Sequence, residues 1–442
     1  MNHKKICQQL IAYALAAGGP GTKAEAALSA STNRSFRLMD GEPQSFTDAT
    51  SQKLRLSILI GQQTASASVE DISDASLRQL ADQVAAMTKV TPPNRDAMLA
   101  TPAQFLHDAD KHLAALDLVD TLTPPLDAAQ LRQLAEKAEQ AALAVPGVTR
   151  GGGASASYIS YSGTQVSSEG FAETYERTTF SVSVSAIAGT GGNQTTGSDW
   201  SAVLHFTDLK DPAELGRKAG EEAVSMQGAG PIPSAPMTVV FDRDVAGELL
   251  GMFSEAIAGM SVAQGNSFLK DALGTQVFAA GINIVDDPSR KRGLGSAVCD
   301  GDGVASPKLT LISGGVLQHW LLSLASAKRL GLTSNGRSNG PTNLYMEPGT
   351  TSRDDLIKGV TKGLLVTGMI GHANTLTTGD LSRGAEGFLI ENGKITRPVS
   401  EVTIGGNLKD MFLNMTPADD LVFDSSVCAP TLKVEGMTVA GR

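Results

Sequence analysis

The stretch Phe180-Ser-Val-Ser-Val-Ser-Ala-Ile187 alternates apolar and small polar side chains with a period of two. This alternation predicts a β-strand with one buried and one exposed face. The same pattern reaches back to Tyr158, and the glycine-rich run from Gly189 to Gly197 predicts the tip of a hairpin. The middle of the chain is therefore expected to be rich in β-strands.

Helical patterns lie on both sides of this region. Asp211-Pro-Ala-Glu214 has the form of a capping box with proline at the first helical position, and it predicts a helix that ends near Met226. A second helix is predicted over 127–143, where leucine and alanine fall on one face. Pro146-Gly147 and the glycines at 151–153 are expected to end that segment.

The N-terminal part combines helices with strands. Residues 1–19 superficially resemble a signal peptide, but glutamines interrupt the apolar run and helical spacing predicts an amphipathic helix. Residues 24–60 alternate small or apolar with polar side chains, which predicts strands with turns at Asp40-Gly41 and at Asp48. Ser73 is a candidate N-cap for a helix over 74–89.

The segment 228–236 is rich in glycine and proline and is the most convincing linker in the chain. A strand over 237–241 and a helix over about 244–258 are predicted to follow it. Gly314-Gly315 and Asn392-Gly393 each separate two strand-like runs, which predicts two hairpins. We expect no repeat architecture, because no fixed period recurs.

The length of 442 residues indicates two or three domains. We predict an N-terminal α+β domain over 1–118, a central β-rich domain over 119–228 and a C-terminal domain over 229–442. The predicted fold class of the whole chain is α+β.

Composition narrows the classes of function. Hydrophobic residues make up 41% and charged residues 19%, which is typical of a globular protein. The net charge of −10 argues against nucleic acid as a partner, and no apolar stretch approaches the roughly 20 residues of a membrane span. The three cysteines are far apart, which favours a reducing compartment and predicts a cytoplasmic location.

Short catalytic motifs do not identify a reaction. The six histidines are His3, His107, His112, His205, His319 and His372, and no pair has the spacing of H-E-x-x-H. Neither a G-x-S-x-G nucleophile elbow nor a phosphate-binding loop with G-x-x-x-x-G-K-[ST] is present. Gly189-Thr-Gly191-Gly192 is a weak match to a nucleotide loop, and a hairpin tip explains it better.

One long segment is far more specific. It reads Thr378-Gly-Asp-Leu-Ser-Arg-Gly-Ala-Glu-Gly-Phe-Leu-Ile-Glu-Asn-Gly-Lys-Ile-Thr-Arg-Pro-Val-Ser-Glu-Val-Thr-Ile-Gly-Gly-Asn-Leu-Lys-Asp410. Together with the stretches 314–322, 267–271 and 434–441, it resembles the PmbA/TldE branch of the TldD/PmbA metallopeptidase family. The resemblance implies a two-lobed fold with mixed or antiparallel sheets, an N-terminal α/β lobe and a larger β-rich C-terminal lobe.

The resemblance also implies a function. In this family, TldD-type and PmbA/TldE-type chains assemble into a peptidase that acts on peptides or unfolded polypeptides. TldD-type chains carry H-E-x-x-x-H and a further cysteine ligand for zinc, whereas the corresponding positions here are Ser254, Glu255 and Gly259. We therefore expect no metal in this chain, with zinc on a TldD-type partner. Cys428 is a candidate for the position of the cysteine ligand, but a lone buried or half-buried thiol is the preferred interpretation.

Two other functions stay open. One is a non-enzymatic protein that binds and modulates another macromolecule, as in the description of the family as modulators of DNA gyrase. The other is an independent hydrolase that uses His319, His372 and Cys428 from distant segments, because metal ligands need only be close in space. The isolated chain could also form a homodimer.

Three residues of the long segment are candidate contacts to peptide or partner. Asp380 and Arg383 suggest an ion pair, a peptide-contacting pair or a salt bridge that stabilises a loop. Asn407 is expected either to cap a short helix or to hold a peptide carbonyl, and capping is preferred. Trp200 and Trp320 are expected to be anchors of a core or an interface.

Overall fold

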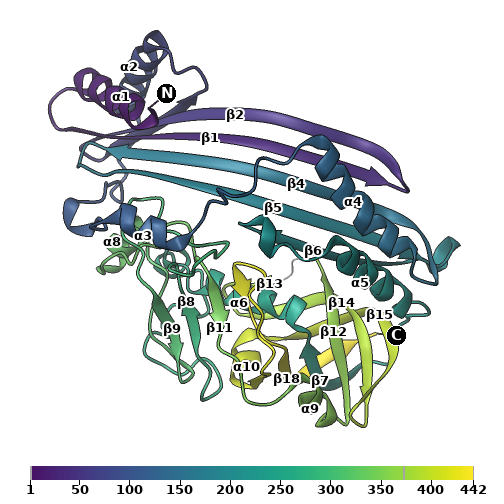
Figure 1. Ribbon diagram of the computed structural model, residues 1–442. Coiled ribbons are helices and arrows are strands. Elements are labelled where there is room, and N and C mark those ends of the chain that lie inside the picture. The colour runs from purple at the N-terminus through teal and green to yellow at the C-terminus, as the bar shows by residue number, and fades with distance from the viewer. Residues whose placement is uncertain (1, 372–373, 442) are drawn as a thin grey trace.

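The chain combines a long antiparallel sheet with a lobe of smaller sheets that lies beneath it (Figure 1). The computed structural model describes residues 2–371 and 374–441. Helices and strands occur in both parts, so the predicted α+β class is confirmed. Within the described residues, no helix is both long and apolar enough to span a bilayer.

The upper sheet contains six strands. They are β1 (Thr22–Met39), β2 (Glu42–Ile60), β3 (Gln63–Val69), β4 (Val148–Ser167), β5 (Ala172–Ala188) and β6 (Thr195–Val203). Their order is β3-β2-β1-β4-β5-β6, and all neighbours are antiparallel. Because β1 pairs with β4, one sheet joins the segments 1–118 and 119–228, and the boundary between them stays a prediction.

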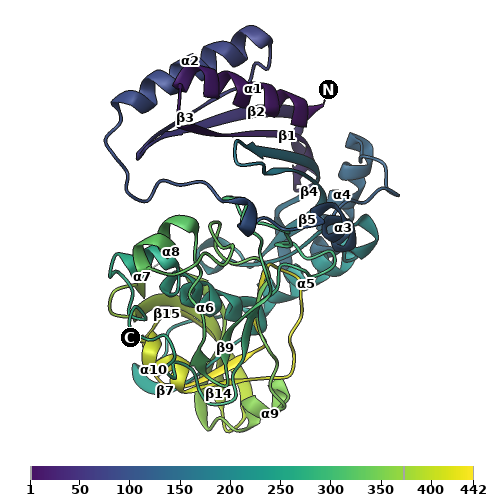
Figure 2. The same cartoon turned by 90° about the vertical axis from the view of Figure 1, so that its left-hand side faces the viewer.

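Two helix pairs cover the same face of this sheet at opposite ends (Figure 2). They are α1 (His3–Gly18) with α2 (Asp74–Val90), and α4 (Ala128–Leu143) with α5 (Pro212–Ser225). Phe180, Val182 and Val184 of β5 are buried against α4 and α5, as their period of two predicts. Burying each such side chain stabilises the folded state by about 1.5–3 kcal/mol relative to leaving it exposed.

The N-caps Ser73 and Asp211 were predicted because their signals are local, whereas Asp127 was predicted only as the start of a helix. Ser73 accepts a hydrogen bond from the Ser76 amide at the start of α2. Asp127 forms a capping box with Gln130 at the start of α4. Asp211 accepts from the Ala213 amide at the start of α5.

The predicted turn at Asp48 and the predicted end of the helical segment at Gly151 to Gly153 are both wrong. Asp48 lies within β2, where it pairs with Arg34 on β1 at 3.2 Å. Gly151 to Gly153 lie inside β4, where the register to β5 shifts. A Cβ on Gly151 would lie 2.5 Å from a carboxylate oxygen of Glu139, so this glycine permits a close approach between α4 and the sheet.

The lower lobe contains a closed barrel of five strands. They are β7 (Ala235–Phe241), β12 (Lys362–Ile370), β14 (Asp380–Glu391), β15 (Lys394–Asn407) and β18 (Leu432–Ala440). The barrel closes because β12 pairs with both β7 and β14. β13 (Asn374–Thr375) and β16 (Met415–Pro417) add short edges. The helix α6 (Arg243–Ala256) follows β7 and packs its apolar face into the same core.

A second, smaller sheet has the order β10-β9-β8-β11-β17. Its strands are β8 (Ile284–Asp286), β9 (Leu309–Ser313), β10 (Val316–Leu317), β11 (Leu344–Met346) and β17 (Val427–Cys428). The remaining helices are α3 (Ala109–Leu116), α7 (Gly259–Ala263), α8 (Leu324–Leu330), α9 (Arg353–Lys358) and α10 (Leu408–Leu413), with short 3-10 turns at Pro102–Gln104, Gly191–Asn193 and Phe206–Asp208. The hairpins at Gly314-Gly315 and Asn392-Gly393 are both present.

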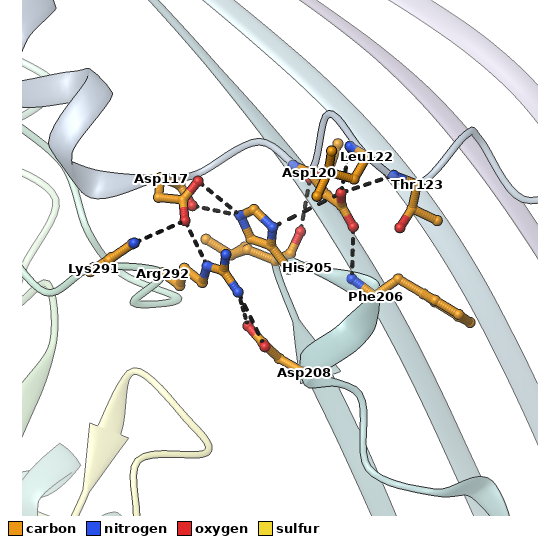
Figure 3. A network of polar contacts seen from close by, with 11 residues as sticks. Asp117, Asp120, Leu122, Thr123, His205, Phe206, Asp208, Lys291 and Arg292 are labelled. Carbon is orange, nitrogen blue, oxygen red and sulfur yellow. Dashed lines mark hydrogen bonds and ion pairs between the residues drawn. The ribbon is translucent and has the colours of Figure 1, made fainter.

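A polar network ties the upper sheet to the lower lobe (Figure 3). Arg292, from a loop of the lower lobe, donates to Asp117 at 2.7 Å and to Asp208 at 2.9 Å. The buried imidazole of His205 lies 2.9 Å from the carbonyl oxygen of Asp117 through its Nε2. These contacts join segments that are far apart in the sequence.

Asp120 at this junction is expected to make the free energy of unfolding depend on pH in the acid range. Burial raises the pKa of its carboxyl, but hydrogen bonds from the backbone amides of Phe206, Thr123 and Leu122 outweigh burial and hold the pKa at about 2. Because this carboxyl has a lower pKa in the folded protein than in the unfolded chain, its ionised form stabilises the fold at every pH above the unfolded-state pKa of 3.8. That stabilisation is lost as the pH falls from 3.8 towards 2. Asp120→Asn should lower the free energy of unfolding at pH 7 by about 2 kcal/mol. This gap in unfolding free energy between the unmodified chain and the variant should narrow below about pH 4.

Urea denaturation of both proteins between pH 7 and pH 3 measures this gap. Asp48→Asn is the control, because its side chain is 47% exposed and its ion pair should contribute little. A gap for Asp120→Asn that stays constant down to pH 3 would contradict the explanation.

Candidate functional site

A cleft with a volume of about 690 Å³ lies between the upper sheet and the lower lobe. Its walls are β6 and α5 on one side and α6 with the segment before and after β17 on the other. The α6 residues that line it include Asp244, Gly247, Glu248 and Gly251. A cleft between two structural units is a common position for a ligand site.

The predicted motif positions lie at the end of α6. Glu255 is exposed and lies on the same face of α6 as exposed Asp244 and Glu248 and half-buried Gly251, since these positions recur every three or four residues. The hydroxyl of Ser254 donates back to the carbonyl oxygen of Gly251 at 2.7 Å. The Ser254 side chain is therefore engaged with its own helix.

Gly259 lies beyond a break in the helix, which ends at Ala256 and not at Ala258 as predicted. It is the first residue of α7, and its amide donates to the carbonyl oxygen of Leu321 at 2.8 Å. A Cβ at this position would lie 2.7 Å from that oxygen and 2.5 Å from the hydroxyl oxygen of Ser326. The backbone around Gly259 leaves no room for a side chain.

These residues do not fit a zinc ion bound through the family motif. At the two positions that the resemblance assigns to imidazoles, the chain has a serine that is bonded to its own helix and a packed glycine. Among residues 2–371 and 374–441, no group of three or more histidine, cysteine and acidic side chains is arranged to hold a metal ion.

Cys428 faces the same cleft as α6. The strand β17 packs closely on α6, and a Cβ on Gly247 would lie 2.8 Å from the carbonyl oxygen of Val427. The thiol donates to the carbonyl oxygen of Ser425 at 3.1 Å, and burial raises the pKa of Cys428. The thiol form is therefore favoured over the thiolate that nucleophiles and metal ligands require.

The hydrolase built from two histidines and this cysteine gains no support from the placement of His319. His319 is exposed and does not line the cleft that contains Cys428. His372 lies outside the described residues.

Most carboxylates in the cleft have cationic partners. Asp242 pairs with Arg353 at 2.8 Å and Asp424 pairs with Lys210 at 3.5 Å. Glu222 accepts from the Ser198 amide at 2.7 Å but has no ion-pair partner among the described residues. Burial raises the pKa of Glu222, and repulsion from neighbouring carboxylates acts in the same direction.

Asp380 and Arg383 do not pair with each other, so that hypothesis is wrong. They lie three positions apart on β14, and the period of two sends their side chains to opposite faces. Arg383 is 4% exposed and donates to Glu248 of α6 at 2.5 Å. Asp380 accepts from the Thr378 hydroxyl at 2.6 Å and from the Asn407 amide group at 2.9 Å.

Asn407 is the N-cap of α10, because its side-chain oxygen accepts from the Lys409 amide at 3.0 Å. Its contact with a peptide carbonyl stays untested. Trp200 is 48% exposed and lines the cleft, whereas Trp320 packs against the core of the lower lobe. The core prediction therefore holds for Trp320 alone.

Comparison with known proteins agrees with this architecture along almost the whole chain. Residues 24–88, 122–227 and 234–441 match models described as PmbA/TldA metallopeptidase domain 1, central domain and C-terminal domain. The chain belongs to the PmbA/TldD metallopeptidase family. The linker predicted over 228–236 includes the gap between the last two matches, although Pro236 is already part of β7.

Relatives within the PmbA/TldD family cover the chain from end to end. Metalloprotease PmbA of Escherichia coli O157:H7 is 32% identical over 99% of this chain and 97% of its own length. The Metalloprotease PmbA homolog of Haemophilus influenzae is 32% identical over 92% of this chain and 89% of its own length. These relatives place the chain in the PmbA branch.

Solved structures show the same fold. A protein of Bacteroides thetaiotaomicron, described as a proposed modulator of DNA gyrase, superposes with a TM-score of 0.93 at 28% identity over 99% of both chains. TldE from Thermococcus kodakarensis superposes with a TM-score of 0.82 at 18% identity, over 99% of this chain and 100% of that one. The second likeness concerns the fold alone.

Proposed function

We propose that this chain is a PmbA/TldE-type subunit of a peptidase that acts on peptides or unfolded polypeptides, and that it depends on zinc held by a TldD-type partner. The observation that carries this proposal is the packing of Gly259 against the Leu321 carbonyl oxygen. A chain in which this position cannot hold an imidazole lacks one of the two histidines that the family motif requires. Hydrolysis then needs a metal from a second chain.

The cleft supports the role of this chain as one wall of a peptide site. It is an open groove of about 690 Å³, and one of its walls is α6, the helix that corresponds by resemblance to the zinc helix of TldD-type chains. Glu255, Glu248 and exposed Trp200 offer polar and aromatic surface beside it. Without a metal-bound water, Glu255 has no catalytic proton to accept in this chain, so its role is to position a peptide or the partner.

Mixing experiments test this proposal. The chain alone should show no peptide cleavage and no stoichiometric zinc by metal analysis. A mixture with a TldD-type chain should form a heterodimer that cleaves an unfolded polypeptide such as reduced casein, and a chelator should abolish the cleavage. Stoichiometric zinc in the chain alone, with chelator-sensitive cleavage, would overturn the proposal.

The alternative function is a non-enzymatic binding protein. The description of the Bacteroides structure as a proposed gyrase modulator favours this alternative. The same mixtures separate the two functions, because a modulator would produce no chelator-sensitive cleavage with any TldD-type chain. Direct binding to purified DNA gyrase would then be the supporting result.

A further inference from the structure

A second cavity, of about 350 Å³, lies on the face of the upper sheet that is turned towards the lower lobe. It shares no lining residue with the cleft beside α6. Strands β4 and β5, the end of α3 and the loop 296–301 form its walls. Its apolar lining includes Leu113, Leu118, Phe171 and Val298.

Two opposite charges face this cavity from a single strand. Glu173, Tyr175 and Arg177 alternate along β5, so all three point to the face opposite the helices. Neither Glu173 nor Arg177 has an ion-pair partner among the described residues. The Arg177 guanidinium instead donates to the carbonyl oxygens of Leu294 and Ser296, at 2.7 and 2.8 Å.

Aromatic rings line the space between these charges. The ring of Tyr175 lies over Gly163 of β4, where a Cβ would be 2.6 Å from it. The rings of Tyr161 and Tyr175 are 5.7 Å apart between centroids. A residue with a side chain at 163 would displace Tyr175, so the glycine keeps this aromatic wall flat against the sheet.

The other polar groups of the cavity are already engaged. Gln165 donates to the carbonyl oxygen of Gly301 at 3.0 Å. Asp300 accepts from the amides of Val304 and Ser338 at 3.0 and 2.8 Å. Glu173 has no side-chain hydrogen bond or ion pair among the described residues, and Arg177 uses two of its five N–H donors for the carbonyl oxygens of Leu294 and Ser296. The Glu173 carboxylate and the remaining N–H groups of Arg177 are the charged donors and acceptors that we assign to a ligand.

We propose that this cavity binds a small zwitterion with an apolar body, such as a short apolar peptide with free termini, its ammonium group at Glu173 and its carboxylate at Arg177. Four residues of strand place the two Cα atoms about 13 Å apart. An extended tripeptide spans about 10 Å, and the two side chains can reach over the remaining distance. The apolar and tyrosine walls would cover the body of such a ligand.

The electrostatic environment agrees with this assignment. Burial raises the pKa of Glu173, Asp110 repels it further, and Lys4 is the cation that opposes them. Burial also lowers the pKa of Arg177. Both side chains are half-buried and neither has an ion-pair partner among the described residues, so a ligand group of the opposite sign would stabilise each charge.

Isothermal titration calorimetry of the purified chain with the tripeptide Leu-Phe-Leu tests the assignment. The free tripeptide should bind, and acetylation of its N-terminus or amidation of its C-terminus should each weaken binding about tenfold. Glu173→Gln should weaken binding of the free tripeptide by a similar factor, while leaving the affinity for the acetylated tripeptide unchanged. If N-terminal acetylation and Glu173→Gln together weaken binding no more than either change alone, the ligand's ammonium group contacts the Glu173 carboxylate.

Glu176→Gln is the matched control, because Glu176 lies on the same strand, is exposed and does not line the cavity. It should leave the affinity for the free tripeptide unchanged. Absence of binding at millimolar tripeptide, or equal affinity of the Glu173→Gln variant and the unmodified chain, would overturn the inference. The assay needs no zinc and no partner chain, so its result does not depend on the proposed peptidase function.

Discussion

Arg337→Met is expected to lower the free energy of unfolding by about 3–5 kcal/mol, the usual cost of breaking one side of a buried ion pair. The side chains of Arg337 and Asp286 are both 0% exposed, and the Arg337 Nε donates to Asp286. Methionine would fill similar space, but it would leave the Asp286 carboxylate buried without a counter-charge. Urea denaturation followed by tryptophan fluorescence measures the loss.

The pair matters because it holds three loops of the lower lobe. Arg337 also donates to the carbonyl oxygens of Pro307 and Asn335, at 2.5 and 3.1 Å. Asp286 accepts from the amide and the hydroxyl of Thr342, at 2.7 and 2.9 Å. Removing Arg337 therefore also leaves buried carbonyl groups without donors.

Two further variants make this prediction sharp. Adding Asp286→Asn to Arg337→Met should restore part of the loss, because the amide oxygen still accepts from Thr342 and the buried charge is gone. Arg353→Met removes the partner of Asp242 where the arginine is 33% exposed, and it should cost no more than about 1 kcal/mol. Similar losses for Arg337→Met and Arg353→Met would show that burial does not govern the strength of the pair at Asp286.

Gly259→His is expected to destabilise the chain by about 3 kcal/mol or more, because overpacking a close backbone contact forces the surrounding segments apart. The new Cβ alone would lie 2.7 Å from the Leu321 carbonyl oxygen, which accepts the hydrogen bond of the same residue. The double variant Ser254→His with Gly259→His should consequently fail to bind stoichiometric zinc. Thermal unfolding and metal analysis of each variant provide the two measurements.

Gly251→His is the matched control on the preceding helix. A Cβ on Gly251 meets no atom within 4 Å, so a histidine there should be tolerated and should change stability by less than about 1 kcal/mol. If Gly259→His proved as stable as Gly251→His, the packing argument for the missing zinc ligand would fail. Zinc binding by the double variant would show that two substitutions suffice to rebuild the site.

Elements whose signals are local were predicted from the residues alone. The caps at Ser73 and Asp211 lie within three residues of the amides that they bind. The alternation through Phe180 correctly indicated which side chains of β5 are buried. The turn at Asp40-Gly41 was found because both residues have positive φ angles, of 51° and 78°, which aspartate and glycine adopt more readily than most residues.

Predictions failed where a distant segment changes the meaning of a local signal. The glycines at 151–153 read as a break, but they lie within a strand because Glu139 of α4 approaches Gly151. Asp380 and Arg383 are three residues apart in the sequence, yet the pleat separates them and α6 supplies Glu248 as the arginine's partner. The pleat of a strand predicts that Asp380 and Arg383 point to opposite faces. It does not predict which helix lies next to Arg383.

The residue patterns alone were enough to determine the α+β class, the approximate bounds of the long helices α1, α2, α4, α5 and α6, and the family. The correspondence of positions 254, 255 and 259 with the zinc motif stays a prediction from the resemblance. Three-dimensional packing decided that Leu321 fills the space beside Gly259, that Cys428 shares a cleft with α6, and that Glu173 and Arg177 face one cavity. The reason is physical: capping and strand alternation act between near neighbours. Clefts and buried charges depend on contacts between segments that folding alone brings together.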